Sequence, residues 1–213
     1  MRLQLCSMEN FDRKQHWEKI YQTKPLQEVS WYQPRPETSL NLITGSFLPK
    51  EANIIDIGGG DSLLSDHLLQ LGYTHLTVLD ISSAAIERAK KRLGPDADKI
   101  NWIEADVSAF TPQNSYDLWH DRAAFHFLQD ENEIKSYIRA ASSGVKPGGY
   151  LIIGTFGPQG PLKCSGIEIK QYSQEELTAL FAENFNVETC LYIDHTTPSG
   201  GNQQFTFCRL KRK

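Results

Sequence analysis

The stretch Asn53–Leu71, NIIDIGGGDSLLSDHLLQL, decides the fold, because an apolar run breaks into three glycines and then into a helical pattern. Its first five residues are too few for a helix and rich in β-branched side chains, which predicts a buried parallel strand with Asp56 near its carboxyl end. Leucines then recur at helical spacing. The stretch therefore predicts a strand, a turn and a helix whose free N–H groups face a ligand at the strand end.

The turn consists of Gly58, Gly59 and Gly60. Glycine tolerates positive φ and lets bare backbone approach a ligand. Plain tight turns have the same composition, so the glycines alone do not identify a nucleotide site. The residues that follow the next two strands decide between these interpretations.

An acidic residue ends each of the next two predicted strands. The run HLTVLDI at residues 75–81 carries Asp80, 20 residues beyond Gly60. A dinucleotide fold places its ribose-binding carboxylate at this distance. The next run, residues 100–107, ends in EADV, with Asp106 as its second acid. Three predicted strands thus end in an acid at one edge of the sheet, which is a poor match to acids that only cap strands.

These motifs, DIGGG at residues 56–60, Asp80 and EADV, resemble the successive motifs of the class I, seven-stranded methyltransferases that use S-adenosylmethionine. The resemblance implies that the glycine turn holds the methionine part, the second acid the ribose hydroxyls and the third the adenine amino group. A carboxylate accepts hydroxyl hydrogen bonds well, and its charge strengthens them. The implied cofactor-binding residues are Trp17, Trp31, Asp56, Gly58, Gly59, Gly60, Asp80, Ile81, Asp106, Val107 and His120. No metal ion is expected.

Two other classes of protein stay open. A nicotinamide-dependent dehydrogenase requires G-x-G-x-x-G, and this chain has Leu63 where the last glycine would fall. A noncatalytic module that binds S-adenosylmethionine is the second alternative.

The length of 213 residues predicts a single α/β domain over residues 1–213. We expect an N-terminal lid with helices over 9–49, a cofactor-binding core over 50–156, and a substrate-side insert with a C-terminal hairpin over 157–213. The resemblance implies a Rossmann-like, doubly wound sheet of seven strands in the order 3-2-1-4-5-7-6, with the last strand antiparallel.

Aromatic residues recur before the first strand, as Trp17 and Tyr21 and then as the pair Trp31-Tyr32. This pattern resembles the start of protein lysine methyltransferases and of small bacterial methyltransferases of unsettled substrate, in which the segment folds over the cofactor as a lid. Such a lid would exclude water and face the sulfonium cation. Packing on the core is the plainer explanation of the same aromatics.

The sequence HDRAAFHFL lies where the resemblance places the active-site motif, and it predicts His120 and Asp121 as catalytic residues. His126 and His195 are weaker candidates, because a histidine is more often structural. Methyl transfer is an in-line displacement whose barrier falls mainly through alignment, so few side chains are obligatory. A base matters only if the nucleophile arrives protonated.

We expect the insert at residues 157–171 and the turn at residues 195–201 to select the substrate. The chain lacks the asparagine-proline-proline-tyrosine signature of many base methylators, so a small-molecule or a protein side-chain acceptor is expected. A net charge of −4 gives no general attraction to nucleic acid or membranes, and no apolar run approaches the ~20 residues of a membrane helix.

Four scattered cysteines without a C-x-x-C pair predict neither a zinc site nor a disulfide framework, and a cytoplasmic location fits them. Residues 1–7 are expected to be an extension that precedes a start at Met8. The sequence does not indicate an oligomeric state.

Overall fold

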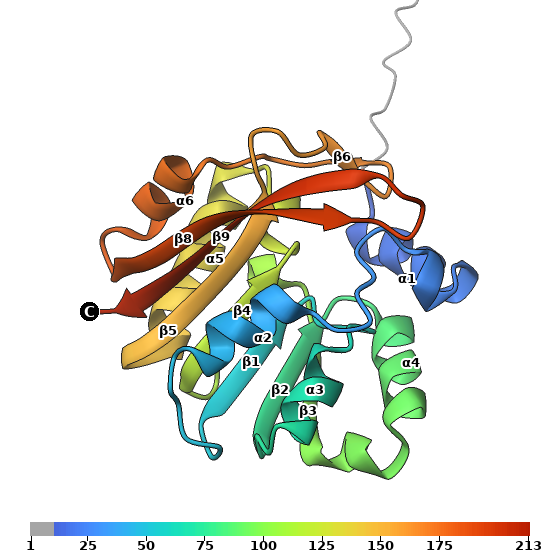
Figure 1. Cartoon of the computed structure of the whole chain (residues 1–213), viewed down its shortest axis with the longest axis horizontal. Coiled ribbons are helices and arrows are strands. Elements are labelled where there is room, and N and C mark those ends of the chain that lie inside the picture. The colour runs from blue at the N-terminus through green and yellow to red at the C-terminus, as the bar shows by residue number, and fades with distance from the viewer. Residues whose placement is uncertain (1–10) are drawn as a thin grey trace, which may run out of the picture.

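A computed structural model of the chain describes residues 11–213. The extension expected for residues 1–7 and the first two residues of the lid, 9 and 10, lie outside the described residues. Seven strands form one sheet in the order β3-β2-β1-β4-β5-β9-β8 (Figure 1). Numbered along the chain within this sheet, the order is 3-2-1-4-5-7-6, and β9 is antiparallel to β5 and β8. The predicted fold is confirmed.

The strands of this sheet are β1 (Asn53–Ile57), β2 (His75–Asp80), β3 (Ile100–Glu104), β4 (Tyr116–Arg122), β5 (Val145–Phe156), β8 (Phe185–Thr196) and β9 (Asn202–Arg212). Two short strands, β6 (Lys163–Cys164) and β7 (Ile167–Glu168), pair within the insert. The helices are α1 (Arg13–Thr23), α2 (Glu37–Thr44), α3 (Leu64–Gln70), α4 (Ser83–Leu93), α5 (Glu131–Gly144) and α6 (Gln174–Phe181).

The sheet is buried on both faces, which explains why β1 has an unbroken apolar run. Ile54 packs in a cluster with residues of α2 and α3 on one face. Ile55 and Ile57 point to the other face and pack with residues of α5 and α6. Helices on both faces leave the carboxyl ends of the parallel strands as the open edge where a ligand can bind.

Local signals place the helices as the sequence predicts. Ser82 precedes α4 and its hydroxyl accepts a hydrogen bond from Ala85 N at 3.1 Å. Ser173 and Glu176 form the predicted capping box of α6. No helix among residues 11–213 combines the length and apolarity that a membrane crossing requires.

The C-terminal hairpin corrects one prediction. Cys190 of β8 and Cys208 of β9 stand directly opposite each other, and their sulfur atoms form a disulfide. The expectation that the cysteines form no disulfide is therefore wrong for this pair. The spacing of the cysteines could not reveal this disulfide. The two cysteines are 18 residues apart in the sequence, and the register of the two strands brings them together.

Alkylation tests this disulfide. In the unfolded, unreduced protein we expect iodoacetamide to leave Cys190 and Cys208 unmodified, and to modify both after reduction. Reduction should lower the free energy of unfolding by about 3 kcal/mol, because the closed loop of the unfolded chain is released. Mass spectrometry of the two peptides is the measurement, and full alkylation without reductant would contradict the assignment.

Candidate active site

The glycine turn after β1 is held against the end of β2. The N–H groups of Gly58 and Gly59 donate to Leu79 O at 2.7 and 3.3 Å. Gly58 and Gly60 have φ of 65° and 30°, and a Cβ at Gly60 would lie 2.4 Å from Asp80 Oδ2. A larger residue would therefore strain the backbone and collide with Asp80.

Asp80 is a buried carboxyl, only 4% exposed. Its Oδ1 accepts a hydrogen bond from Ser82 N at 2.8 Å. Burial raises the pKa of Asp80 to about 7, with a smaller contribution from the negative charge of Asp56. Among residues 11–213 no cation forms a salt bridge with it. A ligand that donates hydrogen bonds to Asp80 would stabilise the ionised form.

A pocket opens over this carboxyl at the strand ends, with about 810 Å³ of empty space including its mouth. Strand ends, lid and hairpin all contribute to its walls. The predicted cofactor residues that line it are Trp17, Trp31, Gly58, Asp80, Ile81, Asp106 and Val107. The others, Asp56, Gly59, Gly60 and His120, lie outside its lining.

The structure does not bring the predicted catalytic residue His120 to the pocket. His120 and Asp56 are opposite each other on β4 and β1, and His120 Nδ1 lies 2.6 Å from Asp56 Oδ1. The other ring nitrogen, Nε2, lies 2.9 Å from the Ser39 hydroxyl of α2. His120 is 2% exposed. With both nitrogens occupied, it braces the base of the glycine turn and does not contact a ligand in the pocket.

Asp121 points into the opposite face of the sheet and is fully buried. Its carboxyl accepts hydrogen bonds from Ala124 N at 2.9 Å and from the Tyr137 hydroxyl at 2.7 Å. Burial raises the pKa of Asp121 to about 6. Neither side chain lines the pocket, so the structure does not support the catalytic role predicted for His120 and Asp121.

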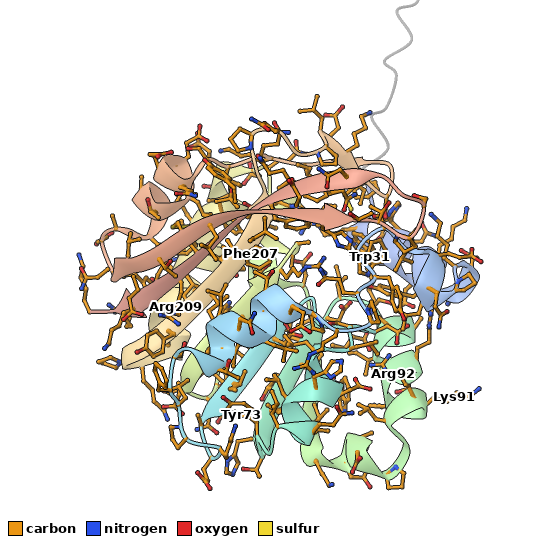
Figure 2. All side chains as sticks on the ribbon, in the orientation of Figure 1. Trp31, Tyr73, Lys91, Arg92, Phe207 and Arg209 are labelled. Atoms are coloured by element: carbon orange, nitrogen blue, oxygen red, sulfur yellow. A yellow bond between two sulfur atoms is a disulfide. The ribbon has the colours of Figure 1, made fainter. Side chains whose placement is uncertain are left out.

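The two weaker candidates are also structural. His126 is buried and Nδ1 accepts from Phe156 N at 3.2 Å, while burial lowers the pKa of His126 to about 3. His195 Nε2 donates to Ser30 O at 2.8 Å, and Nδ1 lies 3.3 Å from Gln33 Nε2. His195 therefore fastens the C-terminal hairpin to the segment around Trp31, which lies between α1 and that hairpin (Figure 2).

Aromatic residues of the N-terminal lid segment pack together at the wall of the pocket. Trp17 makes edge contacts with Trp31 and Phe127, at ring-centroid distances of 5.7 and 5.0 Å. Glu18 accepts hydrogen bonds from Ser83 N at 2.6 Å and Ala84 N at 3.1 Å. A carboxylate at the first turn of α4 is favoured by the free N–H groups there, so the lid is fixed to α4.

Asp106 is bound by a residue that the sequence analysis missed. Arg13 of α1 donates to Asp106 Oδ2 at 2.9 Å and to Glu133 Oε2 at 2.8 Å. Ser108 N also donates to Asp106. The acid implied for the adenine therefore joins the lid to the third strand. No local pattern could have paired Arg13 with a residue 93 positions away.

The pocket wall contains further residues that sequence motifs did not single out. The insert contributes Cys164 and β9 contributes Gln203 and Phe205 to the pocket wall. These positions lie in the two segments expected to select the substrate or next to them. Tyr21, Arg122 and Phe127 also line the pocket. Among the described residues, no cluster of acidic, histidine or cysteine side chains is arranged to hold a metal ion.

Residues 54–149 match a family model described as a methyltransferase domain. The malonyl-[acyl-carrier protein] O-methyltransferase 1 of Ilyobacter polytropus is 29% identical over 150 residues, covering 65% of this chain and 54% of that protein. The eEF1A lysine and N-terminal methyltransferase of Mus musculus is 26% identical over 132 residues, covering 60% of this chain and 18% of that protein. The chain thus spans about half, or less, of the length of these relatives.

Two solved structures share the fold over nearly the whole chain. One is a structure that concerns the conversion of a disulfide bond into a thioacetal group during echinomycin biosynthesis, with a TM-score of 0.75 and 20% sequence identity. The match covers 94% of this chain and 93% of the chain in that structure. The N-methyltransferase NodS of Bradyrhizobium japonicum WM9, in complex with S-adenosylhomocysteine, has a TM-score of 0.67 and 16% identity, with 94% and 99% covered.

Fold and motifs together define a class I methyltransferase domain. Residues 54–149 carry the methyltransferase domain of this family, and the relatives and the fold agree with the resemblance to S-adenosylmethionine-dependent methyltransferases that the sequence analysis predicted. The residues of the pocket fit the cofactor of the family, because the turn leaves room only for glycine and the adjacent buried carboxyl forms no salt bridge with a cation of residues 11–213.

The variant Asp80→Asn tests how much the buried, ionised Asp80 carboxyl destabilises the ligand-free protein. The folded pKa of about 7 lies above the unfolded value of 3.8, so the folded protein keeps a proton that the unfolded chain loses. The free energy of unfolding should therefore fall as the pH rises from about 4 to about 7, by up to ~4 kcal/mol. We expect Asp80→Asn to stabilise the ligand-free protein at pH 8 and to change its stability little at pH 4. Urea denaturation at both pH values measures this, and a destabilised variant at pH 8 would mean that the fold requires the carboxylate.

Proposed function

We propose that the protein transfers the methyl group of S-adenosylmethionine to a nucleophile on a small molecule or a protein side chain. The observation that carries this proposal is Asp80, a buried carboxyl without a cation that faces the pocket beside the glycine turn. When bound, the cofactor supplies an activated methyl group on a sulfonium ion.

Each wall of the pocket supports part of this activity. Asp80 would accept hydrogen bonds from the ribose hydroxyls, and Asp106 and Val107, which line the same pocket, would meet the adenine. Trp17 and Trp31 close the pocket from the lid side. Aromatic faces attract cations and exclude water, which favours both the sulfonium ion and its alignment with the acceptor.

The structure disfavours the dehydrogenase alternative. A third glycine lets a dinucleotide-binding helix pack closely on its strand, but Leu63 occupies that position and precedes α3 as its N-cap residue. A purely binding role stays as the second alternative, and a transfer assay separates it from catalysis. We further propose an acceptor other than nucleic acid, consistent with the charge of −4. The cytoplasmic location expected from the cysteine pattern loses that support, because Cys190 and Cys208 form a disulfide.

Calorimetric titration tests the cofactor assignment. We expect S-adenosylhomocysteine to bind and NADH not to bind, because the turn and the acids suit the former. Gly60→Ala should remove binding, since its Cβ would collide with the Asp80 carboxyl. Gly148→Ala is the matched control, because Gly148 also has positive φ, at 79°, but has open space around a Cβ and lies outside the pocket. NADH binding in the absence of S-adenosylhomocysteine binding would refute the proposal.

A further inference from the structure

Arg122 brings a positive charge into the pocket at the end of β4. Its side chain lines the pocket, and its guanidinium carbon lies 5.2 Å from the centroid of the Phe205 ring. Nη1 donates to Trp31 O at 3.0 Å. Nη2 is buried and has no hydrogen-bond partner among residues 11–213. Arg122 thus has one terminal nitrogen in use and one without a partner, and a small turn of the side chain toward the pocket would present this second nitrogen to a ligand.

No acid in the described part of the chain neutralises this guanidinium. Asp56 is the carboxylate whose charge acts on it, and that carboxylate is already bonded to His120. Burial lowers the pKa of Arg122 to about 10, so the group is still charged at neutral pH. Arg122 is partly exposed in the pocket wall, but a charged group with an unsatisfied, shielded donor is still unfavourable. An anionic ligand at Nη2 would remove this cost.

Among the described side chains that line the pocket, none is an available base near Arg122; His126 and His195, whose pKa values are lowered by burial and in part by the charge of Arg122, lie outside this lining. The titratable side chains of the pocket, among the described residues, are Arg13, Tyr21, Asp80, Asp106, Arg122 and Cys164. Asp80 faces the glycine turn, and Asp106 is paired with Arg13. Burial raises the pKa of Cys164 to about 11 and that of Tyr21 well above its usual value, so both are protonated at neutral pH. An amine or alcohol that arrives protonated would find no acceptor for its proton on this side.

The walls around Arg122 are apolar. Phe205, Phe156 and Phe127 line the same pocket, together with Trp31 of the lid. Aromatic side chains of this kind bind a hydrophobic body, while a single charged group fixes its orientation.

We propose that the methyl acceptor is a carboxylic acid with an apolar body, bound through its carboxylate to Nη2 of Arg122 and methylated on a carboxylate oxygen. This inference rests on the proposed function. A carboxylate fits because it is ionised at neutral pH and needs no base.

The reaction balances without a proton transfer. One carboxylate oxygen forms a bond to the methyl carbon while the bond between that carbon and sulfur breaks. The electron pair of the broken bond stays on sulfur, which gives neutral S-adenosylhomocysteine and a methyl ester. Because Nη1 is occupied by Trp31 O, Nη2 can hold one carboxylate oxygen while the other reacts. The ester is uncharged, so its ion pair with Arg122 is lost and release is favoured.

The test follows labelled methyl groups. The full chain is incubated with S-adenosylmethionine that carries tritium in its methyl group, together with a cell extract of the organism whose genome encodes the protein. The products are then treated with mild base, which releases methanol from methyl esters and leaves N-methyl and ether products intact. We expect most of the transferred label to appear as volatile methanol. Hexanoate should compete for transfer, whereas hexylamine, of the same chain length, should not.

Variants separate substrate binding from support of the lid. Arg122→Gln should reduce ester formation by about 100-fold, the effect of losing a charged hydrogen bond, while S-adenosylhomocysteine affinity stays within about threefold. Arg122→Lys should restore part of the transfer, because an ammonium group also attracts a carboxylate. Arg88→Gln is the matched control for the lid. Arg88 donates to Tyr21 O and Lys24 O at 2.7 and 2.8 Å and forms a salt bridge with Asp61 beside the glycine turn at 2.9 Å, but it does not line the pocket. Its loss should act on cofactor affinity, so ester formation at saturating cofactor should change far less.

The outcomes distinguish this inference from the proposed function. Base-stable label would overturn the carboxylate acceptor and leave methyl transfer standing. The role of Arg122 would be overturned if Arg122→Gln left ester formation unchanged. It would also be overturned if the variant lost S-adenosylhomocysteine affinity by the same factor as it lost ester formation. If Arg122→Gln does not fold, Arg122→Lys and the competition by hexanoate decide the same point. The absence of any labelled product while S-adenosylhomocysteine binds would refute the proposed catalysis itself.

Discussion

The site depends on the burial of the Asp80 carboxyl beneath the glycine turn. Gly60 approaches Asp80 so closely that a Cβ would overlap it, and the turn is fastened to β2 by hydrogen bonds to Leu79 O. The same strand end leads into α4, whose first turn binds Glu18 of the lid. A change in the position of Asp80 would therefore disturb the turn, the helix and the lid together. Burial of this carboxyl makes its ionised form unfavourable in the ligand-free protein. Hydrogen-bond donors of a ligand would stabilise the ionised form and remove this cost.

Charge divides the pocket into two sides. Asp80 and Asp106 lie on the side of β2 and β3, and both can accept hydrogen bonds from a nucleoside. Arg122 lies at the end of β4, among aromatic side chains of β5, β9 and the lid. The fold imposes this separation, because β4 and β2 flank β1 on opposite sides. This separation keeps the inferred carboxylic acid acceptor, at Arg122, away from the carboxylates of Asp80 and Asp106 on the cofactor side.

Sequence patterns predicted the strands well, because buried parallel strands have continuous apolar runs, and the family resemblance supplied their order. The patterns also located the correct edge of the sheet. They failed for His120 and Asp121, since position along a strand does not show which side chain reaches past its end. Consecutive residues alternate between faces, so both point into the covered faces, and Arg122 at the end of β4 lines the pocket. The Arg13–Asp106 pair and the Cys190–Cys208 disulfide depend on distant packing and on strand register, which leave no local pattern.

Proton release on binding tests the central role of Asp80 most directly. The carboxyl has a pKa of about 7 in the free protein, and donors from the cofactor would favour its ionised form. Titration with S-adenosylhomocysteine at pH 7, in buffers of different ionisation enthalpy, should therefore show release of up to about half a proton. The same ligand should release almost none from Asp80→Asn. Equal proton release from both proteins, or none from the wild type, would contradict this account.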